Sequence, residues 1–232
     1  MSARRPPRRI MLVLVAALLG PAARPALAQS PPRMENQMPS DIDPQSGFRL
    51  PLLKPEELDA TARKTYEEAA TPGTSLAGLQ GPAGVQLYSP RTTAHLRALN
   101  RYLRFDAGFS PRIREIAILA TAREMDSQFE WVAHEPEALK HGVPQAVIDV
   151  IKFRKDTAGL DETDALVIAL GRELWRDHKV TSDTFARLKT IFGPHKLVDL
   201  VLLMGNYAGT AALLAAVDMQ LPKGKQPLLP IP

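Results

Sequence analysis

The chain has 232 residues, which is enough for one compact domain with a hydrophobic core. It contains no cysteine, so disulfides and thiol redox chemistry are both excluded. The net charge of +4 depends on five arginines among residues 1–28; the rest of the chain carries 24 basic and 25 acidic residues, a net charge of −1. That balance gives no reason to expect nucleic acid or a membrane surface as a partner.

Residues 1–28 have the layout of a secretory signal peptide. A cluster of four arginines precedes the apolar run Ile10–Leu19, and Ala26 and Ala28 place small residues at −3 and −1 of a cleavage site after Ala28. The apolar run of ten residues is too short to span a bilayer, which takes about 20. We therefore expect an exported protein, periplasmic or secreted, with no membrane association after processing; Arg8-Arg9 leaves the twin-arginine route open.

Residues 29–51 are rich in polar residues and proline without helical periodicity, which predicts a flexible arm. A helical domain is expected over 52–220 and a proline-rich tail over 221–232. Pro55 opens a predicted helix to about Ala70, and the glycines and prolines of 71–84 predict a loop. Ser89-Pro90 starts the next helix, whose buried face we expect to consist of Leu96, Leu99, Leu103 and Phe105.

The middle of the chain repeats these start and stop signals. Ser110-Pro111 opens a predicted helix to about Glu124, and Ser127 is the expected N-cap of a helix that Gly142 ends. A short helix follows from Pro144 to about Phe153.

The acidic residues 161–164 start another predicted helix, which runs to His178. Thr181 or Ser182 caps a helix that Gly193 stops, and Pro194 opens a last helix to Ala216. That helix is apolar on most sides, which indicates a central helix or a subunit interface. No strand alternation occurs, so the pattern predicts an all-α, single-domain bundle of seven to nine helices.

Three side chains on the predicted helix after Ser127 could carry chemistry. Ser127, Glu130 and His134 are three and four residues apart, so they share one helical face. A carboxylate beside an imidazole suits general acid–base catalysis. The alternative is a solvated Glu–His pair of the kind found on many surface helices.

A resemblance to a known family bears on this choice. The segments RIREIAILATARE at 112–124 and SQFEWVAHEPEALKHGV at 127–143 resemble the carboxymuconolactone decarboxylase and alkylhydroperoxidase-D-like superfamily. Its peroxidase branch carries a Glu followed by Cys-x-x-Cys-x-x-x-His. Glu115 occupies the position of that Glu, Ser127 and Glu130 occupy the two cysteine positions, and His134 occupies that of the His.

The resemblance implies an alkylhydroperoxidase-D-like helical bundle and a homo-oligomer, trimeric or hexameric, with its site near a subunit interface. It also implies a cysteine-less branch similar to the lactone decarboxylase. In that reading His134 is the acid or base, Glu115 or Glu130 sets its charge, and Ser127 supports them by hydrogen bonding.

Further residues are candidates for binding substrate. Arg112, Arg114 and Arg123 flank Glu115 and would suit an anionic group, although exposed surface arginines are the ordinary alternative. Trp131 could supply an apolar wall. Glu130 and His134 offer only two metal ligands, so neither a metal nor another cofactor is expected.

We therefore expect a cofactor-free lyase or isomerase that acts on a small lactone or carboxylic acid. Export argues against carboxymuconolactone itself as the substrate. The alternative is a non-catalytic small-molecule-binding or stress-related protein on the same scaffold. Peroxidase activity is disfavoured because Ser127 and Glu130 cannot form a sulfenic acid or a disulfide.

Overall fold

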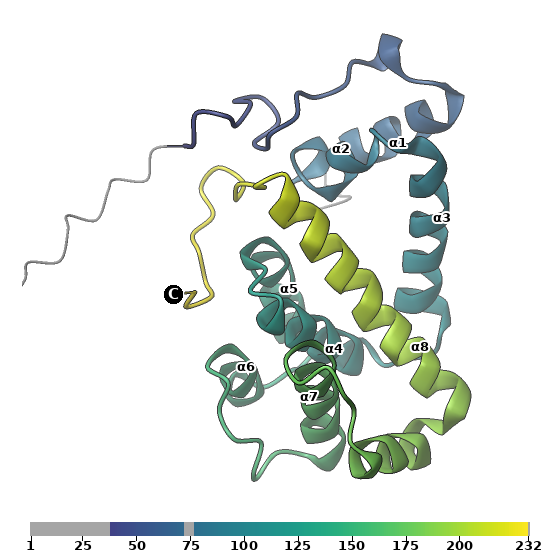
Figure 1. Ribbon diagram of the computed structural model, residues 1–232, viewed down its shortest axis with the longest axis vertical. Coiled ribbons are helices and arrows are strands. Elements are labelled where there is room, and N and C mark those ends of the chain that lie inside the picture. The colour runs from purple at the N-terminus through teal and green to yellow at the C-terminus, as the bar shows by residue number, and fades with distance from the viewer. Residues whose placement is uncertain (1–37, 72–76, 232) are drawn as a thin grey trace, which may run out of the picture. The chain divides into compact units, whose positions relative to one another are not determined.

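A computed structural model of the chain describes residues 38–71 and 77–231. The predicted signal peptide, and residues 29–37 of the predicted arm, lie outside the described residues. The described part contains eight α-helices: α1 (Ala60–Ala70), α2 (Pro82–Gln86), α3 (Pro90–Arg101), α4 (Pro111–Glu124), α5 (Gln128–Lys140), α6 (Gln145–Lys152), α7 (Glu162–Trp175) and α8 (Ser182–Ala216) (Figure 1). Two 3₁₀ turns, η1 (Pro55–Glu57) and η2 (Gly78–Gln80), and one π-helical turn, η3 (Tyr102–Asp106), complete it. The all-α prediction is confirmed.

The predicted helix starts and stops are confirmed where side chains or glycines set them. The Ser110 hydroxyl accepts a hydrogen bond from the Ile113 backbone N–H at 3.2 Å, which caps α4. Gly142 has a φ of 78°, as expected of the residue that ends α5. Gly193, with φ 74° and ψ 166°, interrupts α8, so Pro194 begins its second part.

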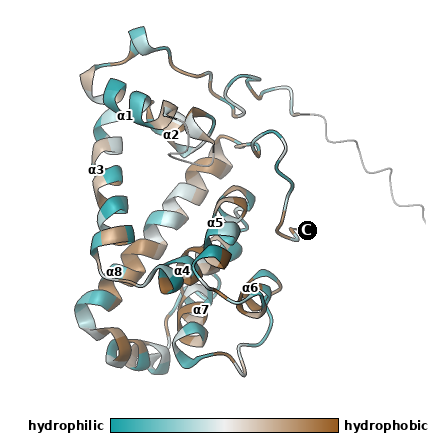
Figure 2. Ribbon diagram, turned by 180° about the vertical axis from the view of Figure 1, so that it is seen from behind, coloured by the Kyte–Doolittle hydropathy of each residue, from teal (hydrophilic) through white to brown (hydrophobic). Residues whose placement is uncertain are grey.

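Helix α4 is the centre of the fold. It packs against α5, α7 and α8, with α6 also in contact (Figure 1). Every residue from Arg114 to Arg123 is buried, and Ile116, Ile118 and Leu119 have no exposed surface. Burying each such side chain contributes about 1.5–3 kcal/mol relative to exposure. The neighbouring helices therefore pack against apolar side chains on several sides of α4, which appear as brown positions in Figure 2.

Helices α4 and α7 approach closely because Gly171 has no side chain. A Cβ at Gly171 would lie 2.9 Å from the Cβ of Ala120, which is shorter than any ordinary carbon–carbon contact. A buried ion pair also joins the two helices: Arg112 of α4 donates to both carboxylate oxygens of Asp164 of α7. The register between α4 and α7 is thus fixed by one steric contact and one polar contact.

The predicted buried face of the helix after Ser89 is wrong in three of four positions. Leu103 is buried, but Leu96, Leu99 and Phe105 are 36%, 37% and 62% exposed. Two features explain the difference. α3 packs mainly against η3, α1, α2 and α8 and not against the central α4. The π turn η3 also contains more residues per turn than an α-helix, so the apolar pattern with a period of 3.6 residues does not continue through it.

The region before α3 is more regular than predicted. The expected loop 71–84 contains η2 and the start of α2, which Pro82 opens at its first position. Its residues 72–76 lie outside the described residues. The expected single helix from Pro55 is divided, because Asp59 caps a new start by accepting from the Ala62 N–H at 2.8 Å.

Both chain ends are packed where they are described. Phe48 is fully buried, and the Arg49 backbone N–H donates to the Val217 carbonyl at 2.9 Å. This corrects the flexible arm over residues 38–51: its aromatic and aliphatic side chains cover the end of α8. The proline-rich tail is held as well, because Leu229 is buried in the main core and the Gln128 side chain accepts from its N–H at 2.7 Å.

Helix α8 is the one helix of the described part with the length and apolar composition to cross a membrane, with a mean hydropathy of 1.6 over its most apolar stretch. Its inner face, including Leu200, Leu203 and Met204, is buried in the main core. Burial of this kind is typical of the core helix of a globular domain.

The contact between α4 and α7 gives a stability prediction. Gly171→Ala is expected to lower the free energy of unfolding by about 1–3 kcal/mol, because the added methyl overpacks the Ala120 contact. The control is Ala146→Ser in α6, at an exposed position where the added hydroxyl faces solvent. That change is expected to alter the free energy of unfolding by no more than about 0.5 kcal/mol. Urea unfolding of both variants measures the difference; equal effects would contradict this account of the helix contact.

Candidate functional site

Glu115 and His134 meet in the interior, where α4 crosses α5. The Nδ1 atom of His134 lies 2.7 Å from Oε2 of Glu115, and the Glu115 side chain has no exposed surface. The other carboxylate oxygen, Oε1, accepts a hydrogen bond from Nε of Arg114 at 3.0 Å. Burial by itself would raise the pKa of Glu115, but the bonds from His134 and Arg114 outweigh it, and the pKa is lowered. Glu115 is therefore an ionised, fully paired carboxylate.

Glu130 lies on the other side of the same imidazole. Its Oε2 atom is 3.6 Å from Nε2 of His134, one turn along α5. Burial raises the pKa of Glu130, and the opposing charges of His134 and Arg104 do not cancel this effect. A raised pKa favours the neutral carboxylic acid, which can donate a proton. The three residues form a line in which a carboxyl with a lowered pKa and a carboxyl with a raised pKa flank one imidazole.

Arg114 links this line to the π turn. Its Nη1 donates to the backbone carbonyl of Arg104 at 2.9 Å, while its Nε holds Glu115. The guanidinium also lies 5.5 Å from the ring centre of Phe105. π turns inside helices occur frequently at functional sites. Here the turn η3 brings the Arg104 carbonyl and the Phe105 ring against Arg114, which in turn holds Glu115.

Tyr207 of α8 completes the surroundings of the imidazole. Its ring meets that of His134 edge-on, with ring centres 5.1 Å apart and an interplanar angle of 85°. Burial raises the pKa of the Tyr207 phenol well above its ordinary value. The phenol therefore stays protonated, and Tyr207 acts as a wall that holds the imidazole plane.

Ser127 begins α5, as the sequence predicts, with backbone angles typical of an N-cap. Its hydroxyl makes no capping hydrogen bond, in contrast to those of Ser110 and Thr181 at the starts of α4 and α8. Ser127 is buried and lies on the face of α5 that carries Glu130 and His134. A hydroxyl that does not cap its own helix can form a hydrogen bond with a neighbouring group.

Three of the four predicted substrate-binding residues are each engaged elsewhere. Arg112 is paired with the buried Asp164, whose hydrogen bonds raise the pKa of Arg112. Arg123 is buried at the far end of α4 and contacts Asp126 at 2.6 Å. Trp131 is fully buried, and its indole N–H donates to Glu135. The Arg112 pair joins α4 to α7, the Arg123 bond lies at the end of α4, and the Trp131 bond lies within α5. The geometry therefore gives no support to a substrate-binding role for any of the three.

Arg104 and Tyr207 were not found by sequence reasoning, and Arg114 was named only as one of three flanking arginines. The position of Arg114 next to Glu115 in the sequence was a usable signal, because an arginine can pair with the carboxylate of the residue beside it. Tyr207 is the single tyrosine in the apolar last helix. Nothing in the sequence distinguishes Arg104 from other arginines, because its place depends on the π turn.

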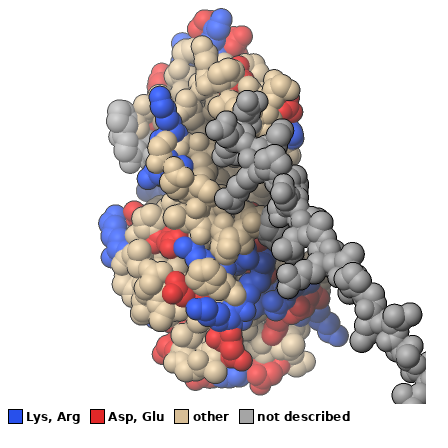
Figure 3. Space-filling model, turned by 90° about the vertical axis from the view of Figure 1, so that its left-hand side faces the viewer, with Lys and Arg blue, Asp and Glu red and all other residues tan. Residues whose placement is uncertain are grey.

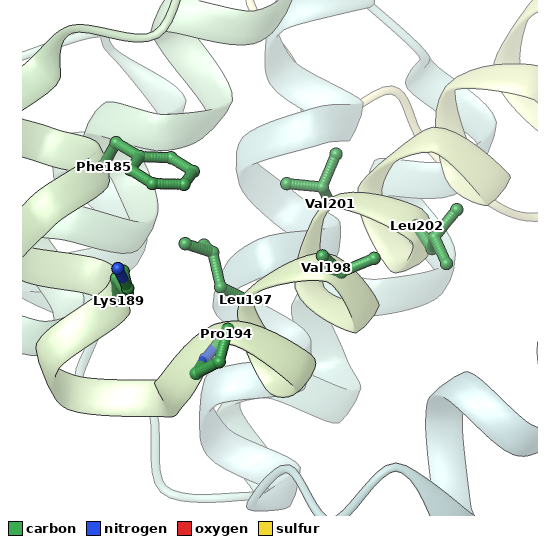
Figure 4. Close-up of a pocket in the computed structure, with 7 residues that line it drawn as sticks. All are labelled: Phe185, Lys189, Pro194, Leu197, Val198, Val201 and Leu202. Atoms are coloured by element: carbon green, nitrogen blue, oxygen red, sulfur yellow. The ribbon is translucent and has the colours of Figure 1, made fainter.

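An apolar pocket in the described part of the chain lies away from this cluster. It has a volume of about 370 Å³ and lies between the two parts of α8, where Phe185 and Lys189 face Leu197, Val198 and Val201 across the kink at Pro194 (Figure 4). Within residues 38–71 and 77–231 no three ligating side chains converge as a metal site would require. Acidic and basic side chains are intermixed on the face shown in Figure 3.

Comparison with known proteins identifies the architecture. No protein-family model matches the sequence, and no curated protein matches it. A crystal structure from Ralstonia eutropha JMP134, described as an alkylhydroperoxidase AhpD core of an uncharacterized peroxidase-related protein, superimposes with a TM-score of 0.62. The match covers 76% of this chain and 93% of that one at 15% sequence identity. The chain has the fold of the alkylhydroperoxidase AhpD core.

The AhpD-core fold is the fold that the resemblance over residues 112–143 predicts. The likeness concerns the backbone arrangement, because 15% identity says nothing of activity. The term peroxidase-related belongs to the other protein. This chain places its own groups, Glu115, Ser127, Glu130 and His134, on an AhpD-core scaffold that holds no cysteine anywhere in its sequence.

The two carboxyls are expected to affect stability with opposite sign. A lowered pKa at Glu115 stabilises the fold above the ordinary carboxyl range, and this contribution is lost as pH falls. Glu115→Gln should therefore cost about 3 kcal/mol at neutral pH and less in acid. A raised pKa at Glu130 destabilises the fold at neutral pH, so Glu130→Gln should stabilise by about 1 kcal/mol there and have no effect in acid.

Urea unfolding between acid and neutral pH measures both effects. The control is Glu56→Gln, because Glu56 is exposed in η1. Shifts of the same sign for Glu115→Gln and Glu130→Gln would contradict the assignment of their charges.

Proposed function

We propose that the protein is a cofactor-free lyase or isomerase that acts by acid–base chemistry on a small lactone or carboxylic acid. The observation that supports this is the line Glu115–His134–Glu130, in which two carboxyls with opposite pKa shifts lie on opposite sides of a buried imidazole. Carboxyls whose environments drive their pKa values apart are the usual arrangement for acid and base roles at one pH.

Each group has a role that follows from its hydrogen bonds. The ionised Glu115 can only accept, so the Nδ1 atom of His134 carries the proton of their shared bond. The Nε2 atom then presents its lone pair on the Glu130 side and can act as the general base. Glu130 is the general acid. The Ser127 hydroxyl supports the substrate or Glu130 by hydrogen bonding.

A decarboxylation would use these groups as follows. The bond between the substrate carbon and its carboxylate breaks, carbon dioxide leaves, and the electron pair passes into the conjugated ring carbonyl as an enolate. Glu130 gives its proton to the carbon that completes the product, and a proton from water restores Glu130. In an isomerisation His134 Nε2 removes a proton from one carbon and Glu130 supplies one to another.

A second candidate is a non-catalytic protein that binds small molecules on this scaffold. The apolar pocket at the kink of α8 supports this alternative, since it is separate from the Glu115–His134 cluster. A peroxidase of the two-thiol type is less favoured, because the sequence contains no cysteine.

Turnover screening of the chain from Gln29 against small lactones and carboxylic acids tests the proposal. His134→Ala and Glu130→Gln are each expected to lower kcat by about 10²–10⁴-fold, the usual contribution of one positioned acid or base. The matched controls are His141→Ala, near the end of α5, and Glu56→Gln. Binding without turnover would favour the binding protein, and turnover that survives both site variants would contradict the assignment of the site. Hydroperoxide turnover with a thiol reductant should be absent.

We further propose that the protein is exported and forms a homo-oligomer, a trimer or hexamer, through α8. The leader-like residues 1–28 support export. The outer face of α8 supports association: Val198 and Leu202 are 58% and 46% exposed, and a Cβ on Gly205 or Gly209 would meet nothing within 4 Å. An apolar face with small residues allows a second helix to approach closely.

The mass of the protein isolated from the cell envelope tests both parts of this proposal. Under denaturing conditions we expect the mass of a chain that begins at Gln29. Under native conditions we expect the mass of three or six such chains. Leu202→Asp should reduce the native mass to that of one chain, whereas the control Leu139→Asp, at an exposed position of α5, should leave it unchanged. An unprocessed chain contradicts export, and a native monomer contradicts association.

A further inference from the structure

Arg104 has a buried polar atom without a partner. Its Nε makes no hydrogen bond within the described residues, although it is shielded from solvent. No ion pair between its guanidinium and a carboxylate is found there either, in contrast to Arg112, Arg114 and Arg123. A buried N–H left unpaired costs about 1–3 kcal/mol, so such a group in a folded protein calls for an explanation.

The carboxylates near Arg104 do not pair with it in the described part of the chain. Arg114 is paired with Glu115 at 3.0 Å, and Glu115 is also paired with His134. Arg104 acts electrostatically on Glu130 and Tyr207, lowering the pKa of each against the effect of burial. Arg104 is thus within electrostatic reach of the cluster, yet its guanidinium forms no ion pair there and its Nε has no hydrogen-bond partner. The cluster therefore offers a cationic donor to an incoming anion.

An aromatic ring lies beside this cation. The Phe105 ring centre is 5.1 Å from the Arg104 guanidinium carbon and 5.5 Å from that of Arg114, and Phe105 is 62% exposed. An exposed ring above two guanidinium groups offers a flat apolar surface next to a positive charge. A planar unsaturated body that carries a carboxylate matches this surface, and a neutral or cationic molecule does not.

We infer that Arg104 binds the carboxylate of a planar, unsaturated substrate, with Phe105 stacking against its conjugated part. The inference rests on the proposed function and names its specificity residue. The guanidinium fork donates two parallel N–H bonds to a carboxylate, a geometry that lysine lacks. The π turn η3 positions the fork, and Arg114 holds the turn through the Arg104 carbonyl and not through its side chain.

The test is direct binding without turnover. Isothermal titration with benzoate, cis,cis-muconate and the neutral benzamide is carried out on the wild type, Arg104→Met, Arg104→Lys and the control Arg101→Met. Arg101 lies on α3 just before the π turn and is exposed. We expect carboxylates to bind the wild type, and Arg104→Met to weaken them by about 10–100-fold, the range for one charged hydrogen-bonding group. Arg104→Lys should fall between, and Arg101→Met should change binding less than about twofold.

An NMR readout keeps the test independent of folding. The Arg104 Nε–Hε signal, identified by its loss in Arg104→Lys, should shift when benzoate is added and not when benzamide is added. Equal carboxylate affinity for Arg104→Met and Arg101→Met, or no carboxylate binding by the wild type, would overturn the inference.

The inference and the proposed function fail in different ways. Arg104-dependent carboxylate binding without any turnover would support the inference and contradict the proposed lyase activity. Turnover that depends on His134, with a KM that Arg104→Met leaves unchanged, would support the lyase and overturn the inference.

Discussion

A carboxylate with no exposed surface, that of Glu115, is the feature on which the site depends. An unpaired charge in such a place would cost several kcal/mol, so the residues around it are constrained to supply donors. Arg114 and His134 do so, one on each oxygen. Because these donors come from α4 and α5, and because Arg114 also holds the Arg104 carbonyl, one buried charge connects two core helices to the π turn. The tautomer of His134 follows from the same bond.

The position of this charge on α4 explains why the site can be precise. α4 is enclosed by α5, α7 and α8, and its contact with α7 is fixed by Gly171 and by the ion pair of Arg112 with Asp164. Catalytic groups held by well-packed helices keep their geometry better than groups on loops. The same enclosure raises the pKa of Glu130, so packing and proton affinity have a common cause. The AhpD-core scaffold thus holds two carboxyls with opposite pKa shifts around one imidazole.

Helix boundaries were predictable because their signals are local. Ser110-Pro111, Gly142 and Gly193-Pro194 act through their own backbone angles and hydrogen bonds, and each ended or began a helix where expected. The spacing of Glu130 and His134 likewise placed them on one helical face, whereas the role of Glu115 followed from the family resemblance and not from spacing. Sequence reasoning failed where the outcome depends on tertiary packing. The stripe Leu96, Leu99 and Phe105 looked buried, but α3 lies at the margin of the core and η3 breaks the period. Arg112 and Arg123 looked free, but their partners Asp164 and Asp126 could not be assigned from spacing alone.

The opposite pKa shifts of the two carboxyls are the central claim of this account, and infrared spectroscopy as a function of pH reads them directly. The carbonyl stretch of the protonated acid that is lost in Glu130→Gln should persist to higher pH than that of an ordinary carboxyl. The carboxylate bands that are lost in Glu115→Gln should persist to lower pH than those of an ordinary carboxyl. A shift of either carboxyl in the opposite direction would contradict the assignment of acid and base at this site.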